Sequence, residues 1–337
     1  MNIIIPMAGM GKRMRPHTLT IPKPLIPVGG KPIVQRLVED ITKVCGEKIN
    51  EIAFVIGPTF GKEVEKLLIE IAKQQGAKGS IHYQDVALGT AHAIMCAESA
   101  ISGKTVVAFA DTLFKADFVM DTKHDGVIWV QSIPDPKQFG VVKLDKDGVI
   151  TDFVEKPQEF ISDLAIIGIY YFKDGDYLKK ELKYLLDNDI RDKGEFQLTN
   201  ALENMKAKGT KFTPGKVSEW LDCGNKDATV YTNQRVLEFD KGKKELHASS
   251  AKIENSKIIE PCFIGENVVI SNSTIGPHVS VGAGTKIDKS TVKNSIIQQN
   301  AKVSSSEIIN SMIGSYTELN DANGDYSLGD YSTIKKA

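Results

Sequence analysis

The sequence predicts an α/β domain with a mixed, mostly parallel sheet and helices on both faces, followed by a left-handed parallel β-helix. Up to about residue 240, apolar residues alternate between strand-like and helix-like spacing, which is typical of parallel strands joined by crossover helices. Beyond a charged stretch, single branched aliphatic residues recur at steps of five or six, the pattern of β-helix coils.

The length of the chain also favours two domains. Its 337 residues exceed the size at which one hydrophobic core usually stops growing. We place the first domain at 1–240, a linker at 241–250, the β-helix at 251–325 and a C-terminal tail at 326–337.

The first domain begins with three β-branched residues, Ile3 to Ile5, which predict a buried strand before Pro6. Thr199 is expected to cap a later helix and Gly209 to end it. The further strands are expected at 51–57, 80–84, 104–110, 126–132, 140–144, 149–155, 166–172 and 216–221. The helices are expected at 32–44, 63–75, 92–100, 177–186, 198–206 and 228–239.

The C-terminal repeat resembles the hexapeptide repeat of a left-handed β-helix, in which one branched aliphatic on each face points inward. The inward positions predict about four coils. They are Ile253, Ile258, Ile264, Ile270, Ile275, Val281, Ile287, Val292, Ile297, Val303, Ile308, Ile313 and Leu319. Some β-helix proteins are acyltransferases that need an activating histidine, and His278 is the only histidine in the repeat. Its neighbours Pro277 and Val279 favour a turn residue and a scaffold or oligomer contact instead.

Composition excludes a general attraction to polyanions. The 42 lysines and arginines nearly balance the 43 aspartates and glutamates, so we expect neither nucleic acid nor a membrane surface as a partner. The four cysteines lie far apart, without zinc-site spacing, which favours a reduced compartment. The N-terminus has three isoleucines before a proline, too few for a signal peptide, and no later run approaches a membrane span. We expect a cytoplasmic protein.

The most informative segment is 2–32, where a strand leads into a glycine-rich turn and then into Pro-Lys-Pro-Leu. Glycines allow backbone N–H groups to close around phosphate oxygens, and four cations lie nearby: Lys12, Arg13, Arg15 and Lys23. This combination predicts a nucleoside triphosphate site. The spacing fits neither the common phosphate loop, which requires Gly-Lys-Ser/Thr, nor G-x-G-x-x-G.

The same segment resembles the opening signature of the sugar-1-phosphate nucleotidylyltransferases, or nucleotide-sugar pyrophosphorylases, in particular the glucose-1-phosphate thymidylyl- and uridylyltransferases. That signature reads G-x-G-x-R-x-x-P-x-T followed by P-K-P-L. The residues that fit it are Gly9, Gly11, Arg13, Pro16, Thr18, Pro22, Lys23, Pro24 and Leu25. Lys12 replaces the usual threonine and Met14 the usual leucine. The resemblance implies a Rossmann-like first domain.

The resemblance also implies a reaction and its cofactor. These enzymes join a sugar 1-phosphate to the α-phosphorus of a nucleoside triphosphate and release pyrophosphate, with Mg²⁺ held by two aspartates. Asp111 and Asp222 match those ligands, although Ala110, Cys223 and Asn225 depart from the usual surroundings. The attacking phosphate is already ionised at neutral pH, so the chemistry needs cations and a metal rather than a general base.

Further site residues follow from the same resemblance. The catalytic cations are Arg13, Lys23 and Lys156. The nucleotide-binding residues are Ala8, Gly9, Gly11, Lys12, Gln84, Gly89 and Thr90. The sugar-binding residues are Gly140, Glu155, Lys156, Gly168, Tyr170, Glu195 and Trp220.

Gln84 supports a choice of base. Its amide offers one donor and one acceptor side, which complements the N3–H and carbonyl oxygens of uracil or thymine, whereas guanine favours a carboxylate. We therefore expect dTTP or UTP and glucose 1-phosphate as substrates, and a homo-oligomer with β-helix contacts. Two alternatives stay open: a mannose-1-phosphate guanylyltransferase, and a non-catalytic regulatory subunit that binds nucleotide sugars.

Overall fold

The computed structural model describes residues 1–115, 118–243 and 246–335. The chain forms two compact units. Unit 1 comprises Met1–Gly9 and Gln35–Trp220, and unit 2 comprises Met10–Val34 and Leu221–Ala337. The domain boundaries drawn from the sequence stay a prediction, and residues 244–245 of the expected linker lie outside the described residues.

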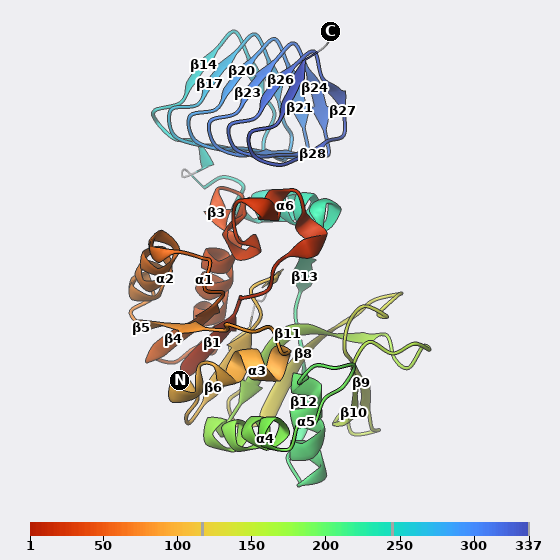
Figure 1. Cartoon of the computed structure of the whole chain (residues 1–337). Helices are drawn as coiled ribbons and strands as arrows, with labels where there is room; N and C mark the ends of the chain where they lie inside the picture. Colours follow the sequence, from red (N-terminus) through yellow and green to blue (C-terminus); the bar gives the residue numbers. More distant parts are fainter. Residues whose placement is uncertain (116–117, 244–245, 336–337) are drawn as a thin grey trace. The chain divides into compact units, whose positions relative to one another are not determined.

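Unit 1 contains a nine-stranded mixed sheet with the order β10-β9-β11-β6-β1-β4-β5, to which β8 and β12 are added beside β11 (Figure 1). The strands β1, β4, β5 and β6 are parallel, and β11 runs antiparallel to β6 and β8. The bounds are β1 Asn2–Pro6, β4 Glu51–Ile56, β5 Lys78–Tyr83, β6 Thr105–Ala108, β8 Gly126–Ser132, β9 Val141–Leu144, β10 Ile150–Val154, β11 Leu164–Phe172 and β12 Phe212–Lys216. The predicted α/β class is confirmed.

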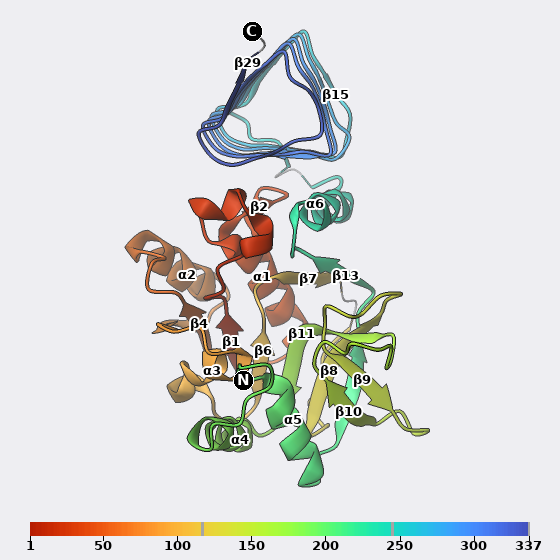
Figure 2. The same cartoon turned by 45° about the vertical axis from the view of Figure 1, so that its right-hand side comes forward.

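Helices cover both faces of this sheet (Figure 2). Alternating residues such as Ile4, Ala53 and Val107 point into a core shared with α3, α4 and α5. The helices α1 and α2 lie on the opposite face. Their bounds are α1 Ile33–Cys45, α2 Lys62–Gln74, α3 Thr90–Met95, α4 Gly175–Asp187 and α5 Leu198–Ala207.

Three predictions for unit 1 need correction. Thr199 lies inside α5 rather than at its cap, because the helix already begins at Leu198 after Gln197. The helix expected at 92–100 ends at Met95 and is followed by a separate 3-10 turn, Glu98–Ala100. The strand expected at 216–221 is shorter and forms β13, Glu219–Asp222. Two further strands were not expected, namely β12, which precedes β13, and the short β7, Thr112–Lys115. Gly209 does end α5, with a φ of +101°.

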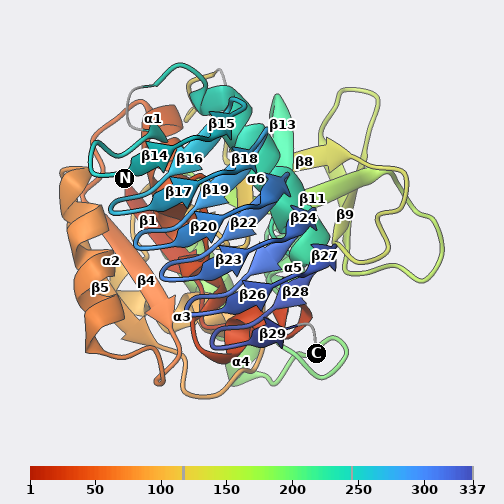
Figure 3. The ribbon, with the colours of Figure 1, turned by 90° about the horizontal axis from the view of Figure 1, so that it is seen from above.

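The C-terminal part of unit 2 is built from three parallel sheets of six, five and five short strands, which wind into a left-handed β-helix. Figure 2 shows its triangular section, and Figure 3 shows successive strands of one face side by side. The first sheet holds β14 Lys252–Glu254, β17 Val269–Ser271, β20 Lys286–Asp288, β23 Lys302–Ser304, β26 Glu318–Asn320 and β29 Thr333–Lys335. The second holds β15 Lys257–Ile258, β18 Thr274–Ile275, β21 Thr291–Lys293, β24 Glu307–Ile309 and β27 Asn323–Gly324. The third holds β16 Cys262–Ile264, β19 Val279–Val281, β22 Ser295–Ile297, β25 Met312–Ile313 and β28 Ser327–Leu328.

The predicted register of inward aliphatics is confirmed from Ile264 to Leu319, all of which are buried in one core. Ile253 remains 39% exposed because it lies on the first coil, where no earlier coil covers it. The expected four coils are too few. Six strands stack in the first sheet, and the last of them ends at Lys335. The sequence pattern predicted fewer coils because residues such as Gly324 replace the branched aliphatics in the last coils.

The remainder of unit 2 consists of the glycine-rich segment and one helix. The segment forms three 3-10 turns, Lys12–Met14, His17–Leu19 and Lys23–Leu25, and a short hairpin of β2 Pro27–Val28 and β3 Lys31–Pro32. The helix α6, Lys226–Asp240, begins after Asn225, whose side chain accepts a hydrogen bond from Ala228 N at 3.0 Å. Among residues 1–115, 118–243 and 246–335, no helix has the length and apolar character that a bilayer crossing requires.

Candidate functional site

Unit 2 brings Arg13 and Asp222 together beside Gly224. The position that a Cβ would take on Gly224 lies 2.8 and 3.0 Å from the two carboxylate oxygens of Asp222 and 3.2 Å from Nη2 of Arg13. Asp222 is the last residue of β13, and its carbonyl oxygen accepts a hydrogen bond from Thr232 Oγ1 of α6 at 2.8 Å. An acidic and a cationic group that were predicted to share a polyphosphate therefore lie in one place.

Gly11 positions Lys23 within the same unit. Gly11 has a φ of +57°, and a Cβ there would lie 3.0 Å from both Lys23 Cβ and Thr18 Cγ2. The Thr18 hydroxyl donates to the Gly11 carbonyl oxygen at 2.9 Å. Only glycine combines this left-handed backbone with so close a neighbour. Lys23 is buried, at 8% exposure, whereas Lys12 and Arg13 are exposed.

Unit 1 holds Ala8, Gly9 and Asp111 at the carboxyl edge of its parallel strands. Ala8 and Gly9 follow β1, and the amide N–H of Ala110 donates to Pro6 O at 3.3 Å, which places Asp111 beyond the end of that strand. Asp111 is exposed. Burial, followed by the nearby charges of Glu155 and Asp111, raises the pKa of the Tyr170 hydroxyl. Asp111 and Glu155 are thus close enough to influence one buried tyrosine.

Glu155 and Lys156 form a strained turn after β10. Lys156 has a φ of +42°, a left-handed conformation that costs a side-chain-bearing residue energy, and its Nζ lies 3.4 Å from Glu155 Oε1. Lys193 holds this turn, because its Nζ donates to the carbonyl oxygens of Glu155 at 2.9 Å and Lys156 at 3.0 Å. Sequence reasoning missed Lys193, since nothing in the sequence places a distant exposed lysine against this backbone.

Gly140, Glu155 and Thr199 lie close together. A Cβ on Gly140 would lie 3.1 Å from Glu155 Oε2 and 3.7 Å from Thr199 Cγ2. The buried hydroxyl of Thr199 has no hydrogen-bond partner among the described residues. Because a buried hydroxyl without a partner is costly, it is suited to bind a polar ligand group. Thr199 was expected only as a helix cap and is a further candidate for sugar binding.

The remaining predicted sugar residues lie on neighbouring elements of unit 1. Trp220 Nε1 donates to Thr112 Oγ1 at 2.6 Å, and its ring packs edge-on against Phe139. Gly168 has a φ of +84° within β11, two residues before the buried Tyr170. Glu195 is exposed and accepts from Gln197 Nε2 at 3.0 Å.

Gln84, Gly89 and Thr90 form the predicted base-reading segment. Gln84 Nε2 lies 3.3 Å from the Gly89 carbonyl oxygen, to which it donates, and 3.1 Å from His92 Nδ1. Burial lowers the pKa of His92, which favours the neutral ring whose Nδ1 accepts this bond. A Cβ on Gly89 would lie 2.5 Å from Phe196 O, so glycine is required there. The Thr90 hydroxyl donates to Gln197 Oε1 at 3.1 Å.

The donor chemistry of the two predicted metal ligands fits Mg²⁺. Both are carboxylates, the hard oxygen ligands that this ion prefers, and neither is fully buried. Within the described parts of the chain, no three His, Cys, Asp or Glu side chains gather into a cluster able to hold a metal. Two carboxylates leave most coordination positions to substrate oxygens and water, which is usual for Mg²⁺ at phosphates.

His278 is a turn residue, as predicted. Its φ is +63°, and its Nε2 lies 2.6 Å from Glu238 Oε1 of α6. The ring is thus occupied with a structural contact inside unit 2.

Residues 2–238 match the family model described as nucleotidyl transferase. The glucose-1-phosphate thymidylyltransferase of Streptomyces antibioticus is 28% identical, with 99% of each chain covered. The low-salt glycan biosynthesis nucleotidyltransferase Agl11 of Haloferax volcanii is 30% identical over 96% of this chain and 94% of that relative. The bifunctional protein GlmU of Methanococcus vannielii is 28% identical over 94% of this chain and 78% of its own length.

Two solved structures are also similar to this chain. A putative glucose-1-phosphate thymidylyltransferase from Bacillus anthracis has a TM-score of 0.59 and 26% identity, and the match covers 69% of this chain and 93% of that one. A UDP-glucose pyrophosphorylase complexed with UDP-glucose, at 23% identity and a TM-score of 0.57 over 71% of this chain and 98% of its own, shares the fold. From the family match over most of its length, this chain belongs to the nucleotidyl transferase family.

Proposed function

We propose that this protein transfers a nucleotidyl group from dTTP or UTP to glucose 1-phosphate in a magnesium-dependent reaction that releases pyrophosphate. The observation that carries the proposal is the meeting of Arg13 and Asp222 beside Gly224, because both residues match the signature of enzymes with this activity. The relative from Streptomyces antibioticus bears the name glucose-1-phosphate thymidylyltransferase, which supports the choice of substrates.

The proposed mechanism relies on charge rather than on a general base. An oxygen of the sugar phosphate attacks the α-phosphorus, and the bond to the oxygen that bridges toward the β-phosphate breaks. Arg13 and Lys23 hold the triphosphate and offset the negative charge that grows on the departing pyrophosphate. Asp111 and Asp222 would hold Mg²⁺, which supplies further neutralisation of the phosphate oxygens.

The sugar phosphate is proposed to bind at the turn of Glu155 and Lys156. Lys156 pairs with the phosphate, and Glu155 accepts hydrogen bonds from sugar hydroxyls. The left-handed backbone of Lys156 and the two hydrogen bonds from Lys193 support this assignment, since strained backbone persists where its surroundings fix it. Tyr170, Thr199 and Gly140 are proposed to line the sugar subsite, and the unpartnered hydroxyl of Thr199 supports this.

The base is proposed to be read by Gln84. Because Nε2 of its amide faces the acceptors Gly89 O and His92 Nδ1, its carbonyl oxygen is the group that reads a base. A carbonyl acceptor matches the N3–H of uracil or thymine. Guanine presents two adjacent donors and matches this arrangement less well.

We also propose that the protein acts in the cytoplasm and assembles as a homo-oligomer through β-helix contacts. Cys45, Cys96 and Cys262 take part in no disulfide, which supports a reducing compartment.

The test is pyrophosphate release from the purified protein with each pairing of dTTP, UTP, CTP, ATP and GTP with glucose 1-phosphate, mannose 1-phosphate and glucosamine 1-phosphate. The proposal predicts the highest kcat/KM with a uracil or thymine nucleotide and glucose 1-phosphate, and no release after EDTA treatment. Turnover of GTP with mannose 1-phosphate alone would instead establish a guanylyltransferase. Silence across the panel would support a regulatory subunit.

A further inference from the structure

The segment that carries Arg13 and Lys23 is attached to the last coils of the β-helix. Nε2 of His17 lies 3.1 Å from the hydroxyl of Ser327, which belongs to β28. His17 is fully buried, and its Nδ1 has no hydrogen-bond partner in the part of the chain that the structure describes. The hydrogen bond with Ser327 therefore satisfies one of the two nitrogens of this buried ring.

Two further contacts lie beside it. The hydroxyl of Thr20 donates to Asp330 Oδ2 at 2.7 Å, and the other oxygen of Asp330 accepts from Ser315 N at 2.7 Å. Asp330 therefore joins the segment to two successive turns of the β-helix. A Cβ on Gly329 would lie 3.0 Å from Pro16 Cβ, so the coil and the segment are in close contact.

The other end of the segment is fixed to the earlier coils through α6. Asn233 Oδ1 accepts from Gly29 N at 2.9 Å and from Ser280 Oγ of β19 at 2.7 Å. The side chain of Phe263 fills the space beside Gly30, where a Cβ would lie 2.2 Å from its ring. Asn233 is completely buried, so one side chain connects the segment, the helix and the β-helix.

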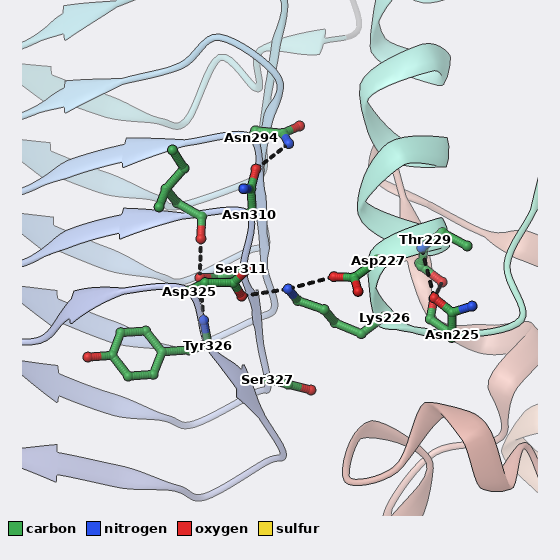
Figure 4. Close-up of polar contacts among 12 residues, drawn as sticks. Asn225, Lys226, Asp227, Thr229, Asn294, Asn310, Ser311, Asp325, Tyr326 and Ser327 are labelled. Atoms are coloured by element: carbon green, nitrogen blue, oxygen red, sulfur yellow. Dashed lines mark hydrogen bonds and ion pairs between the residues drawn. The ribbon is translucent and has the colours of Figure 1, made fainter.

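The helix itself is fixed to the same late coils. Lys226 Nζ lies 2.5 Å from Asp325 and 2.9 Å from Asp227 (Figure 4). Figure 4 also shows Ser327 on the side of the β-helix that carries this contact. The segment therefore meets the late coils directly and, through α6, at a second place.

We infer that Ser327 and Asp330 are positioning residues for the triphosphate subsite: the last coil of the β-helix holds segment 10–34 in the conformation that presents Arg13 and Lys23. The inference rests on the proposed function, because it assigns these cations to the triphosphate. It gives the β-helix a role in substrate binding besides that of a scaffold or oligomer contact.

The physical consequence is specific to one substrate. A segment released from the coil has to be ordered when the triphosphate binds, and the cost of that ordering is subtracted from the affinity. The turn of Glu155 and Lys156 lies in unit 1 and has no part in these contacts. The KM for the triphosphate should therefore rise while the KM for the sugar phosphate stays unchanged.

The experiment uses the full chain with the double substitution Thr20→Val and Ser327→Ala. Valine keeps the shape of threonine and removes its donor, and alanine removes the hydroxyl that meets His17. With two hydrogen bonds lost, the triphosphate KM should rise about tenfold, with kcat changed less than about threefold. Thr20→Ser alone keeps both hydrogen bonds and should leave the triphosphate KM at the wild-type value. Lys302→Met removes an exposed ion pair with Glu318 on another face and serves as the matched control.

Hydrogen–deuterium exchange gives a readout that does not require activity. Amides of 10–34 should exchange at least tenfold faster in the double variant than in the wild type, and the Lys302→Met variant should match the wild type. A triphosphate KM and exchange rates that equal those of the wild type would overturn the inference. If the wild type turns over no substrate, the proposed function fails. The exchange experiment then still decides the inference: faster exchange of 10–34 in the double variant shows that the last coil holds the segment, and unchanged exchange shows that it does not.

Discussion

Arg13 and Asp222 direct opposite charges at one point beside Gly224, although they lie at opposite ends of the matched family region. Within unit 2, this arrangement depends on the glycine-rich turn and the end of β13. It joins a cation proposed for the leaving pyrophosphate to an acid proposed for the metal. Substitution of Asp222 measures how much this arrangement contributes to catalysis.

The substitution Asp222→Asn should lower kcat at least a hundredfold. The amide keeps the size of the side chain but removes the charge, which is a loss on the scale of removing an electrostatic catalytic group. Pyrophosphate release measures the effect, and circular dichroism checks that the fold is kept. Asp227→Asn, an exposed acid at the start of α6, is the matched control. Turnover near the wild-type rate in Asp222→Asn would remove this residue from the site.

Lys156 allows charge and backbone strain to be separated. Both Lys156→Gly and Lys156→Ala remove the ammonium, and both should raise the KM for glucose 1-phosphate. At a φ of +42°, glycine is relaxed and alanine is strained, so the glycine variant should be about 1 kcal/mol more stable than the alanine variant. Thermal unfolding compares the two. Equal stability would mean that this turn does not keep its left-handed conformation.

The β-helix is stabilised by a ladder of buried serines. The hydroxyl of Ser290 donates to Asp288 O at 2.8 Å and accepts from Ser306 N at 3.1 Å. Ser290→Ala leaves the buried N–H of Ser306 without a partner, which should lower the free energy of unfolding by about 1–3 kcal/mol. Denaturant titration measures the loss. Ser304→Ala, whose hydroxyl bonds to the exposed Asn320, should cost clearly less, and an equal cost would contradict the ladder.

His17 should make unit 2 sensitive to acid. Burial, opposed by Asp330 and assisted by Lys226, lowers the pKa of His17 from 6.5 to about 4. Between these values the unfolded chain binds a proton that the folded chain does not, so stability falls as the pH drops from 6.5 to about 4. The loss is about 3 kcal/mol at most. Chemical denaturation at several pH values should show a flatter acid limb for His17→Asn than for the wild type, and an unchanged slope in this variant would contradict the assignment.

Much of the fold could be predicted because its signals are local. Branched aliphatics at steps of five or six predicted the β-helix core, and alternating apolar spacing predicted the parallel strands. The strand β12 was not predicted because Pro214 and Gly215 are unusual in strands. It forms nevertheless because β12 lies at the edge of the sheet, where it pairs with β8 alone, and an edge strand tolerates proline. The short β7 depends on residues distant in the sequence, such as Ser218, whose N–H donates to Lys115 O.

The candidate site was predicted only in part, because some of its residues carry a local sequence signal and others depend on tertiary contacts. The family signature indicated Arg13, Lys23 and Asp222, which the structure gathers in unit 2. Lys193 and Thr199 were missed as site residues because their roles depend on tertiary contacts with the turn at Lys156 and with Gly140. The attachment of His17 to Ser327 likewise joins residues that no local pattern connects.

Transfer of label from a triphosphate carrying ³²P at the α-position tests the central claim most directly. With dTTP or UTP and glucose 1-phosphate, the label should appear in a nucleoside diphosphate sugar and be absent from the released pyrophosphate. Label that stays in the triphosphate, or that appears only in free nucleotide, would contradict nucleotidyl transfer by this protein.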